Sequence, residues 1–219
     1  MYKLIIFDWD GTLIDSAQRI TQCMLRAAKD AGLAQPSASQ IRELIGLGLP
    51  EMVEALFPGI SPQSNQYFRT IYSHHFFDAD QQPSPTFPHV RETLTALREA
   101  SYSLAVATGK SRRGLDRGMQ NTGLGEYFSA SRCADETASK PHPQMLFELL
   151  EHYGVQASDA LLVGDTSFDL QMAQAAGIDS TAVLYGVHGA ERLEPFAPKA
   201  FFTSIRDIVH WLTETKEKG

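Results

Sequence analysis

The sequence predicts an α/β fold with a doubly wound, mostly parallel sheet and an inserted all-helical domain. Short apolar runs alternate with helical patterns after residue 88, which is typical of a parallel sheet with helices on both faces. Another apolar run, at 4–7, stands by itself near the start of the chain. Residues 16–78 show helical patterns and no strand-like run, so this block would interrupt the sheet after its first strand.

The first part of the chain is expected to form a strand at 2–7 and then only helices. Ser16 is the expected N-cap of the first helix, because serine readily satisfies free N–H groups at that position. Pro50 suits the first turn of a later helix, where its missing N–H group is not needed. The expected helices cover residues 16–31, 39–45, 50–57 and 62–77.

Residues 78–88 are rich in proline and glutamine and are expected to be a linker. We therefore predict an all-helical cap at 16–84 and an α/β core built from 1–15 and 85–219. After the linker, helices and strands are expected to alternate. The helices would cover 90–100, 111–122, 143–153, 167–176 and 205–214, and the strands 103–108, 128–133, 160–163, 181–184 and 200–203.

The composition is that of an ordinary globular protein, with 43% hydrophobic and 21% charged residues among 219. A net charge of −7 and an isoelectric point near 5.5 argue against binding to nucleic acid or an anionic membrane, since both need a basic face. The sequence has no signal-peptide pattern and no apolar run of bilayer length. We expect a cytoplasmic protein, a monomer or weak homodimer, with no nucleic-acid or membrane partner.

Two carboxylates, Asp8 and Asp10, come directly after the first apolar run, and Gly11 then permits a sharp turn. In open α/β sheets, ligands bind at the carboxyl ends of the strands, so chemistry is expected at this place. The alternative is a plain strand-ending turn that leads to a helix cap.

Polar residues also mark the ends of other predicted core elements. Thr108 and Gly109 follow one strand, Lys140 precedes a helix, and Asp165 and Asp169 follow another strand. Each has an ordinary structural explanation as a strand end, a solvated lysine or a helix cap. In a parallel sheet, however, all of them would converge on one edge.

Such a cluster suits phosphoryl transfer. Asp8 and Asp165 could hold Mg²⁺, a hard cation that binds carboxylates, water and phosphate oxygens. Lys140 and the backbone amides at Gly109 and the following helix start would hold the remaining phosphate oxygens. The expected partner is therefore a small phosphorylated metabolite, and the expected cofactor is Mg²⁺.

The four segments occur in the order found in the haloacid dehalogenase superfamily, and the whole chain closely resembles its phosphatases. That resemblance implies a Rossmann-like core with a helical cap inserted after the first motif. The opening Phe-Asp-x-Asp-Gly-Thr-Leu-x-Asp-Ser is most similar to phosphoglycolate-phosphatase-like members. The residues that carry the resemblance are Asp8, Asp10 and Thr12, then Thr108, then Lys140, and finally Gly164, Asp165 and Asp169.

The resemblance also implies a role for each residue. Asp8 would attack phosphorus and become an aspartyl-phosphate, and Asp10 would protonate the leaving oxygen and later activate water. Asp8, Asp10 (through its backbone carbonyl) and Asp165 would bind Mg²⁺, while Thr12 and Asp169 support the site. The implied reaction is Mg²⁺-dependent hydrolysis of small phosphomonoesters, with phosphoglycolate as the predicted substrate.

A glycine-containing cap loop is expected to lie over the site and to select the substrate, because glycine lets backbone approach a ligand closely. The alternative is a plain connection between two helices. The residues of this loop are Gly46, Leu47, Gly48 and Leu49.

Two nucleotide-binding interpretations fail on spacing. The run Gly109-Lys110-Ser111 resembles the end of a P-loop, but Leu104 stands where that motif needs glycine. The run Gly46-Leu47-Gly48 begins a dinucleotide fingerprint, but Glu51 takes the place of its last glycine.

The same fold supports other activities. A dehalogenase would not need Asp10 as an acid, and a phosphonate-cleaving relative needs a cap lysine, for which Lys29 is the only candidate. A sugar phosphomutase similar to β-phosphoglucomutase shares the core motifs and stays open as an alternative. So does a non-catalytic phosphate-binding regulatory protein.

Overall fold

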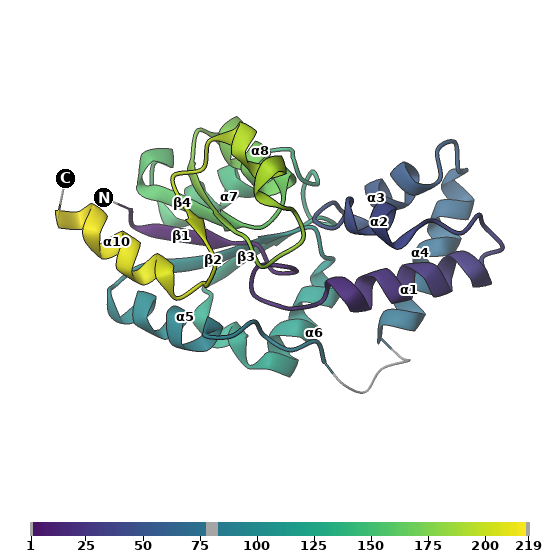
Figure 1. Cartoon of the computed structure of the whole chain (residues 1–219), viewed down its shortest axis with the longest axis horizontal. Helices are drawn as coiled ribbons and strands as arrows, with labels where there is room; N and C mark the ends of the chain where they lie inside the picture. Colours follow the sequence, from purple (N-terminus) through teal and green to yellow (C-terminus); the bar gives the residue numbers. More distant parts are fainter. Residues whose placement is uncertain (1, 78–82, 218–219) are drawn as a thin grey trace.

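The computed structural model describes residues 2–77 and 83–217, and its centre is a six-stranded sheet (Figure 1). All of its strand pairs are parallel, in the order β3-β2-β1-β4-β5-β6, which confirms the predicted fold class. The order reverses between β1 and β4, and ligands bind at such switch points. The strands are β1 (Leu4–Phe7), β2 (Ser103–Thr108), β3 (Ala130–Cys133), β4 (Ala160–Gly164), β5 (Asp179–Val183) and β6 (Phe201–Phe202).

Helices cover both faces of the sheet because successive side chains of a strand point to opposite sides. Ile5 and Phe7 pack in the hydrophobic cluster formed with α5 (Val90–Glu99), α6 (Arg112–Thr122) and α10 (Asp207–Glu217). Leu4 and Ile6 pack in a second cluster, formed with α7 (Gln144–Tyr153) and α8 (Ser167–Ala176). The central strand β1 is therefore completely buried, which explains its continuous apolar sequence.

Four of the remaining helices lie to one side of the sheet and pack against each other (Figure 1). We call these four helices the cap. Its own hydrophobic cluster includes Ile20, Met24, Ile41, Val53 and Phe68. The cap helices are α1 (Ala17–Asp30), α2 (Ala38–Arg42), α3 (Leu49–Leu56) and α4 (Pro62–Phe77).

The two connections between cap and core run side by side. Ile14 and Thr86 form an antiparallel bridge, and the Asp15 N–H donates a hydrogen bond to the Pro85 carbonyl over 2.9 Å. Residues 78–82 of the predicted linker lie outside the described residues. The division into 1–15 with 85–219 and 16–84 stays a prediction.

Most element boundaries agree with the prediction to within a few residues, but local differences occur. The short helix at 190–193 and the 3₁₀ turns at 124–127, 157–159 and 194–196 were not predicted. Ser16 is the N-cap residue of α1, as predicted, but its side chain makes no capping hydrogen bond. Its hydroxyl binds Asp10 instead, as described below.

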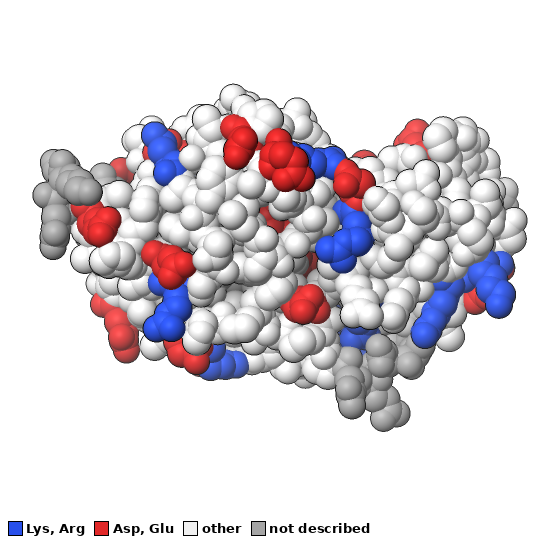
Figure 2. Space-filling view, in the orientation of Figure 1, with Lys and Arg blue, Asp and Glu red and all other residues white. Residues whose placement is uncertain are grey.

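Acidic and basic side chains are interspersed on the face shown in Figure 2, with no continuous basic area among the residues described there. Within the described part of the chain, no helix has the length and apolar character that a bilayer crossing requires.

Candidate active site

Asp8 follows β1 at the centre of the sheet and is only 1% exposed. Its Oδ1 accepts a 2.6 Å hydrogen bond from Lys140 Nζ, whereas its Oδ2 is buried and has no hydrogen-bond partner within residues 2–77 and 83–217. Burial raises the pKa of Asp8 to about 7; Lys140 lowers that pKa, and Asp169 raises it. A buried carboxylate oxygen without a hydrogen bond is costly, so a bound ligand is the natural partner for it.

Lys140 enters the site from the segment before α7, and its side chain is fully buried. The ammonium bridges Asp8 Oδ1 and Asp169 Oδ1, at 2.6 Å from each. Burial alone would lower the pKa of Lys140, but Asp169 and Asp8 raise it above its ordinary value. The solvated-lysine alternative is therefore wrong, and Lys140 is a fixed positive charge in the site.

Asp165 follows β4 and is held on both carboxylate oxygens. Its Oδ1 accepts from Thr12 Oγ1 over 2.8 Å, and its Oδ2 accepts from the Val187 N–H over 2.8 Å. Burial raises its pKa well above the ordinary value, and the charges of Asp8 and Asp169 raise it further. Gly11, at φ +93°, leaves the space that Asp165 occupies, because a Cβ there would lie 2.2 Å from Asp165 Oδ2.

Asp169 lies in the first turn of α8 and forms a capping box with Thr166. Asp169 Oδ2 accepts from the Thr166 N–H over 3.0 Å and from Thr166 Oγ1 over 2.7 Å. Asp165 precedes this N-cap and is outside the helix. Their spacing of four residues predicts that Asp165 and Asp169 share one helix face. That prediction is wrong because Asp165 lies outside the helix, and Asp169 reaches the site through Lys140.

Three carboxylates approach closely enough to share a cation: Asp8, Asp165 and Asp169 each offer an oxygen, all within 4.8 Å of one another. Hard carboxylate oxygens and the unpartnered Asp8 Oδ2 fit Mg²⁺. The Asp10 side chain is not part of this group. Its expected contribution was the backbone carbonyl, and that stays a prediction.

Asp10 instead faces the junction with the cap. Its Oδ1 accepts from Ser16 Oγ over 2.6 Å, and its Oδ2 accepts from Lys110 Nζ over 2.6 Å. The Lys110 ammonium also lies 4.8 Å from the centre of the Phe76 ring, which belongs to α4. Ser16, Lys110 and Phe76 were not predicted to belong to the site. The motif that contains Lys110 resembles a P-loop only in part, and it gives no sign of this contact.

The loop after β2 meets the predicted cap loop directly. Thr108 is buried, and its Oγ1 accepts a 3.2 Å hydrogen bond from the Lys110 N–H. A Cβ on Gly109 would lie 2.4 Å from the Gly46 carbonyl oxygen and 2.5 Å from that of Leu47. Only glycine at position 109 permits this approach, so the cap loop does border the predicted phosphate-binding loop.

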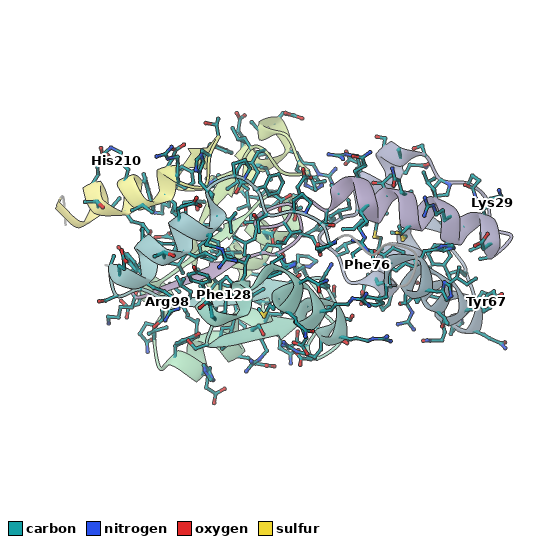
Figure 3. The ribbon with its side chains drawn as sticks, turned by 90° about the horizontal axis from the view of Figure 1, so that it is seen from below. Lys29, Tyr67, Phe76, Arg98, Phe128 and His210 are labelled. Atoms are coloured by element: carbon teal, nitrogen blue, oxygen red, sulfur yellow. The ribbon has the colours of Figure 1, made fainter. Side chains whose placement is uncertain are left out.

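A cavity of about 100 Å³ lies between the cap and the core. Its core side is polar and its cap side is apolar. Figure 3 shows Phe76 at the junction of the two regions, while Tyr67 and Lys29 lie at the far end of the cap. The lining residues are Asp8, Asp10, Thr108, Gly109, Lys110, Ser111 and Gly114 from the core, and Ile20, Ile45, Gly46, Leu47, Leu49, Met52, Tyr72, Ser73, Phe76 and Phe77 from the cap.

Comparison with known proteins places this geometry in a family. A profile of haloacid dehalogenase-like hydrolases matches residues 5–183. The protein named "Probable phosphatase IndB" from Dickeya dadantii is 31% identical over 216 residues, covering 95% of this chain and 93% of that protein. The phosphoglycolate phosphatase of Pectobacterium atrosepticum is 32% identical over 210 residues, covering 94% and 90%.

Solved structures agree with this assignment. A predicted phosphoglycolate phosphatase from Haemophilus somnus 129PT is 26% identical and has a TM-score of 0.87, covering 96% of this chain and 98% of that one. The profile match covers most of the chain, and both curated relatives align along nearly their whole length. The resemblance inferred from the motifs is thus confirmed: the chain belongs to the haloacid dehalogenase-like hydrolase family and is a phosphatase of its phosphoglycolate-phosphatase-like group.

Proposed function

We propose that this phosphatase hydrolyses small phosphomonoesters with Mg²⁺ and an aspartyl-phosphate intermediate on Asp8, and that phosphoglycolate is its substrate. One observation carries the proposal. A buried carboxylate with an unpartnered oxygen, Asp8, borders a small cavity and lies beside a fixed ammonium and two further carboxylates. The names of the curated relatives support phosphoglycolate as the first substrate to test.

The reaction would proceed in two steps. An Asp8 carboxylate oxygen attacks phosphorus, the bond between phosphorus and the ester oxygen breaks, and Asp10 gives that oxygen a proton. Water then attacks phosphorus while Asp10 takes up its proton. The bond between phosphorus and Asp8 breaks, inorganic phosphate leaves, and both carboxyl groups return to their first state.

The surrounding residues would hold the phosphoryl group in place. Lys140, Thr108 and the Gly109 amide would bind its oxygens and stabilise the charge that develops on them. Mg²⁺, when bound by the carboxylates of Asp8 and Asp165 and the Asp10 backbone carbonyl, would offset repulsion between the nucleophile and the anionic ester. Thr12 would keep Asp165 oriented through its 2.8 Å hydrogen bond.

Asp10 is held as a proton acceptor. Both of its oxygens accept hydrogen bonds, one from Ser16 and one from Lys110. An ionised carboxylate has this pattern, which suits the second step. In the first step Asp10 must carry a proton, so we expect its contacts with Ser16 and Lys110 to change when an ester binds.

The size of the cavity favours a phosphatase over a sugar phosphomutase. At about 100 Å³ it is smaller than the roughly 300–1,000 Å³ typical of pockets for larger ligands. Phosphonate cleavage is also disfavoured, because Lys29 is exposed at the far end of α1 (Figure 3). The family assignment disfavours the non-catalytic alternative. The cytoplasmic location and the monomer or weak homodimer stay predictions.

Phosphate release from a panel of phosphorylated metabolites tests the proposal. We expect Mg²⁺-dependent turnover, with phosphoglycolate among the substrates of highest kcat/KM. A phosphorylated species that forms on wild type in rapid-quench experiments, and is absent from an Asp8→Asn variant, would identify the intermediate. Turnover without such a species, or no turnover of any ester, would contradict the proposal.

A further inference from the structure

Among the described residues, the side chains that line the cavity include three charged ones. Two are the carboxylates of Asp8 and Asp10, and the third is Lys110. Lys140 lies deeper and is fully buried by its two carboxylate partners. Lys140 is expected to bind the phosphoryl group, so Lys110 is the cation that the rest of a ligand in the cavity would meet.

The Lys110 ammonium has N–H groups available for a further hydrogen bond. Its ammonium carries three N–H groups, and among the described residues it donates one hydrogen bond, to Asp10 Oδ2 over 2.6 Å. The Phe76 ring, 4.8 Å away, holds the ammonium through its π face and offers no hydrogen-bond acceptor of the ordinary kind. The side chain is 12% exposed, so the ammonium is positioned and partly desolvated but can accept a further anionic partner.

The cap side of the cavity contributes no cation to the lining. Its lining is aliphatic or aromatic apart from Gly46, the Ser73 hydroxyl and the Tyr72 phenol, and none of its side chains is charged. A second anionic group on a substrate would leave water at a cost of several kcal/mol unless an opposite charge received it. Within the cavity, Lys110 is the group able to do so.

The position of Lys110 limits where that anionic group can lie. In the proposed reaction, Asp10 contacts the ester oxygen of the leaving group. Because Lys110 Nζ is one hydrogen bond away from Asp10, the ammonium lies within about two hydrogen-bond lengths, ~6 Å, of that ester oxygen. A carboxylate on the carbon next to the ester oxygen would reach it, whereas an anionic group several atoms further along would not.

We propose that Lys110 determines substrate specificity by binding a carboxylate carried on the carbon next to the ester oxygen, an inference that rests on the function proposed above. Substrates are then phosphate esters of 2-hydroxy acids with small carbon skeletons. On binding, the substrate carboxylate competes with Asp10 for Lys110. Asp10, released from the ammonium, takes up a proton from solvent and donates that proton to the ester oxygen of the leaving group.

Binding of unreactive analogues tests this without turnover. 3-Phosphonopropionate replaces the ester oxygen of phosphoglycolate by carbon, and propylphosphonate has the same chain without the carboxylate. Calorimetry on the Mg²⁺-loaded wild type should show tighter binding of 3-phosphonopropionate, by about ten- to a hundredfold, as expected for a charge-assisted hydrogen bond. In Lys110→Met, whose apolar chain can still pack on Phe76, this preference should fall below about threefold.

Arg113→Met provides the matched control. Arg113 also lies over an α4 ring, at 5.0 Å from the centre of Phe77, but it is exposed and does not line the cavity. Its replacement removes the same charge, so the preference for 3-phosphonopropionate should stay within about twofold of wild type. A fall of equal size in both variants would indicate general electrostatics and would overturn the proposal.

Steady-state kinetics distinguish two roles for Lys110. It could bind the substrate carboxylate and so determine specificity, or it could only hold Asp10 in position. For phosphoglycolate, Lys110→Met should raise KM at least about tenfold, while the KM for ethyl phosphate should change about threefold or less. An equal fall of kcat for both esters, with KM unchanged, would overturn the proposal. If wild type hydrolyses neither ester, the proposed function fails, and the calorimetric comparison still decides what Lys110 binds.

Discussion

The core side and the cap side of the cavity are built in opposite ways. In the core, Asp165 and Asp169 have both carboxylate oxygens occupied, and Lys140 is held by two carboxylates. On the cap side the wall is almost entirely apolar. The cap loop is held to the core by a small number of contacts, such as the 2.8 Å hydrogen bond from the Gly48 N–H to Ser139 Oγ.

This difference follows from what each side contains. Buried charges are stable only with fixed partners at short distance, so the core side has one arrangement of its polar atoms. Apolar side chains pack without directional bonds and tolerate substitution when volume is kept. We therefore expect changes on the core side to abolish the reaction, and changes on the cap side to alter which ester reacts.

The largest effect is expected for Asp8→Asn, which removes the proposed nucleophile and keeps the side-chain shape. Turnover should fall at least about a thousandfold, as is usual when a covalent nucleophile is removed. The variant should remain folded, because an amide oxygen can still accept from Lys140. Circular dichroism and steady-state kinetics measure the two expectations. Asp15→Asn changes an exposed carboxylate close by and should keep turnover within about twofold of wild type. If Asp8→Asn kept turnover within about tenfold of wild type, Asp8 would not be the nucleophile.

Removal of Mg²⁺ should also abolish turnover, and it should change how stability depends on pH. Burial raises the pKa of Asp8 from 3.8 to about 7, and that of Asp165 is raised as well. At a pH between 3.8 and about 7, Asp8 keeps its proton in the folded protein, whereas it has lost that proton in the unfolded chain. The free energy of unfolding of the metal-free protein should therefore fall as pH rises from about 4 to 7.

Urea unfolding at about pH 5 and about pH 8, with EDTA or with Mg²⁺, measures this dependence. Mg²⁺ should restore stability mainly at the higher pH, where the carboxylates are ionised and bind it. In Asp8→Asn the fall with pH should be smaller, since one of the shifted groups is gone. Metal-free protein that gained stability over this range, or that kept full turnover in EDTA, would disprove the carboxylate cluster as a cation site.

The residues on the core side of the cavity could be predicted from the sequence because its chemistry depends on charged residues near strand ends. The structure brings Asp8, Asp165, Asp169 and Lys140 together as predicted, since the carboxyl ends of parallel strands meet at one edge. The details that failed concern local hydrogen bonds. Ser16, for example, could bind either the helix N–H groups or Asp10, and its sequence position does not distinguish the two.

The cap side could not be read in the same way. Tyr72 and Phe76 line the cavity, but an aromatic residue in an amphipathic helix has the same pattern whether it faces a core or a ligand. Lys110 was missed because its partners are distant from it in sequence: Asp10 follows another core strand, and Phe76 reaches Lys110 only when the cap packs on the core. The cap loop was located through its glycines, which signal a close backbone approach.

On the cap side, Gly48→Phe should change substrate ranking more than chemistry. The backbone of Gly48, at φ −62° and ψ 150°, suits any residue, but a Cβ would lie 2.8 Å from Ser139 Oγ and 2.4 Å from Glu51 Oε2. The Glu51 and Ser139 side chains must move aside, and the bulk of the phenyl ring then displaces the loop from its present packing. The kcat/KM ratio of phosphoglycolate to p-nitrophenyl phosphate should change about tenfold. Ala55→Phe, with similar bulk on an exposed face of α3, should leave it within about twofold; an unchanged ratio in Gly48→Phe would show that this loop does not select the substrate.

The smallest effect is expected for Ser139→Ala, which removes the acceptor of the Gly48 N–H and leaves the core carboxylates intact. A neutral hydrogen bond contributes about 1 kcal/mol, so kcat/KM for phosphoglycolate should fall only about two- to fivefold. Hydrogen exchange of the Gly48 amide should become faster by a similar factor, because that amide loses its partner when the loop is in place. Ser158→Ala, at an exposed position outside the cap, should change neither quantity. Faster exchange with unchanged kcat/KM would mean that the loop opens freely without limiting turnover. A fall of kcat/KM beyond about fiftyfold would mean that this contact belongs to the catalytic arrangement and not to the cap.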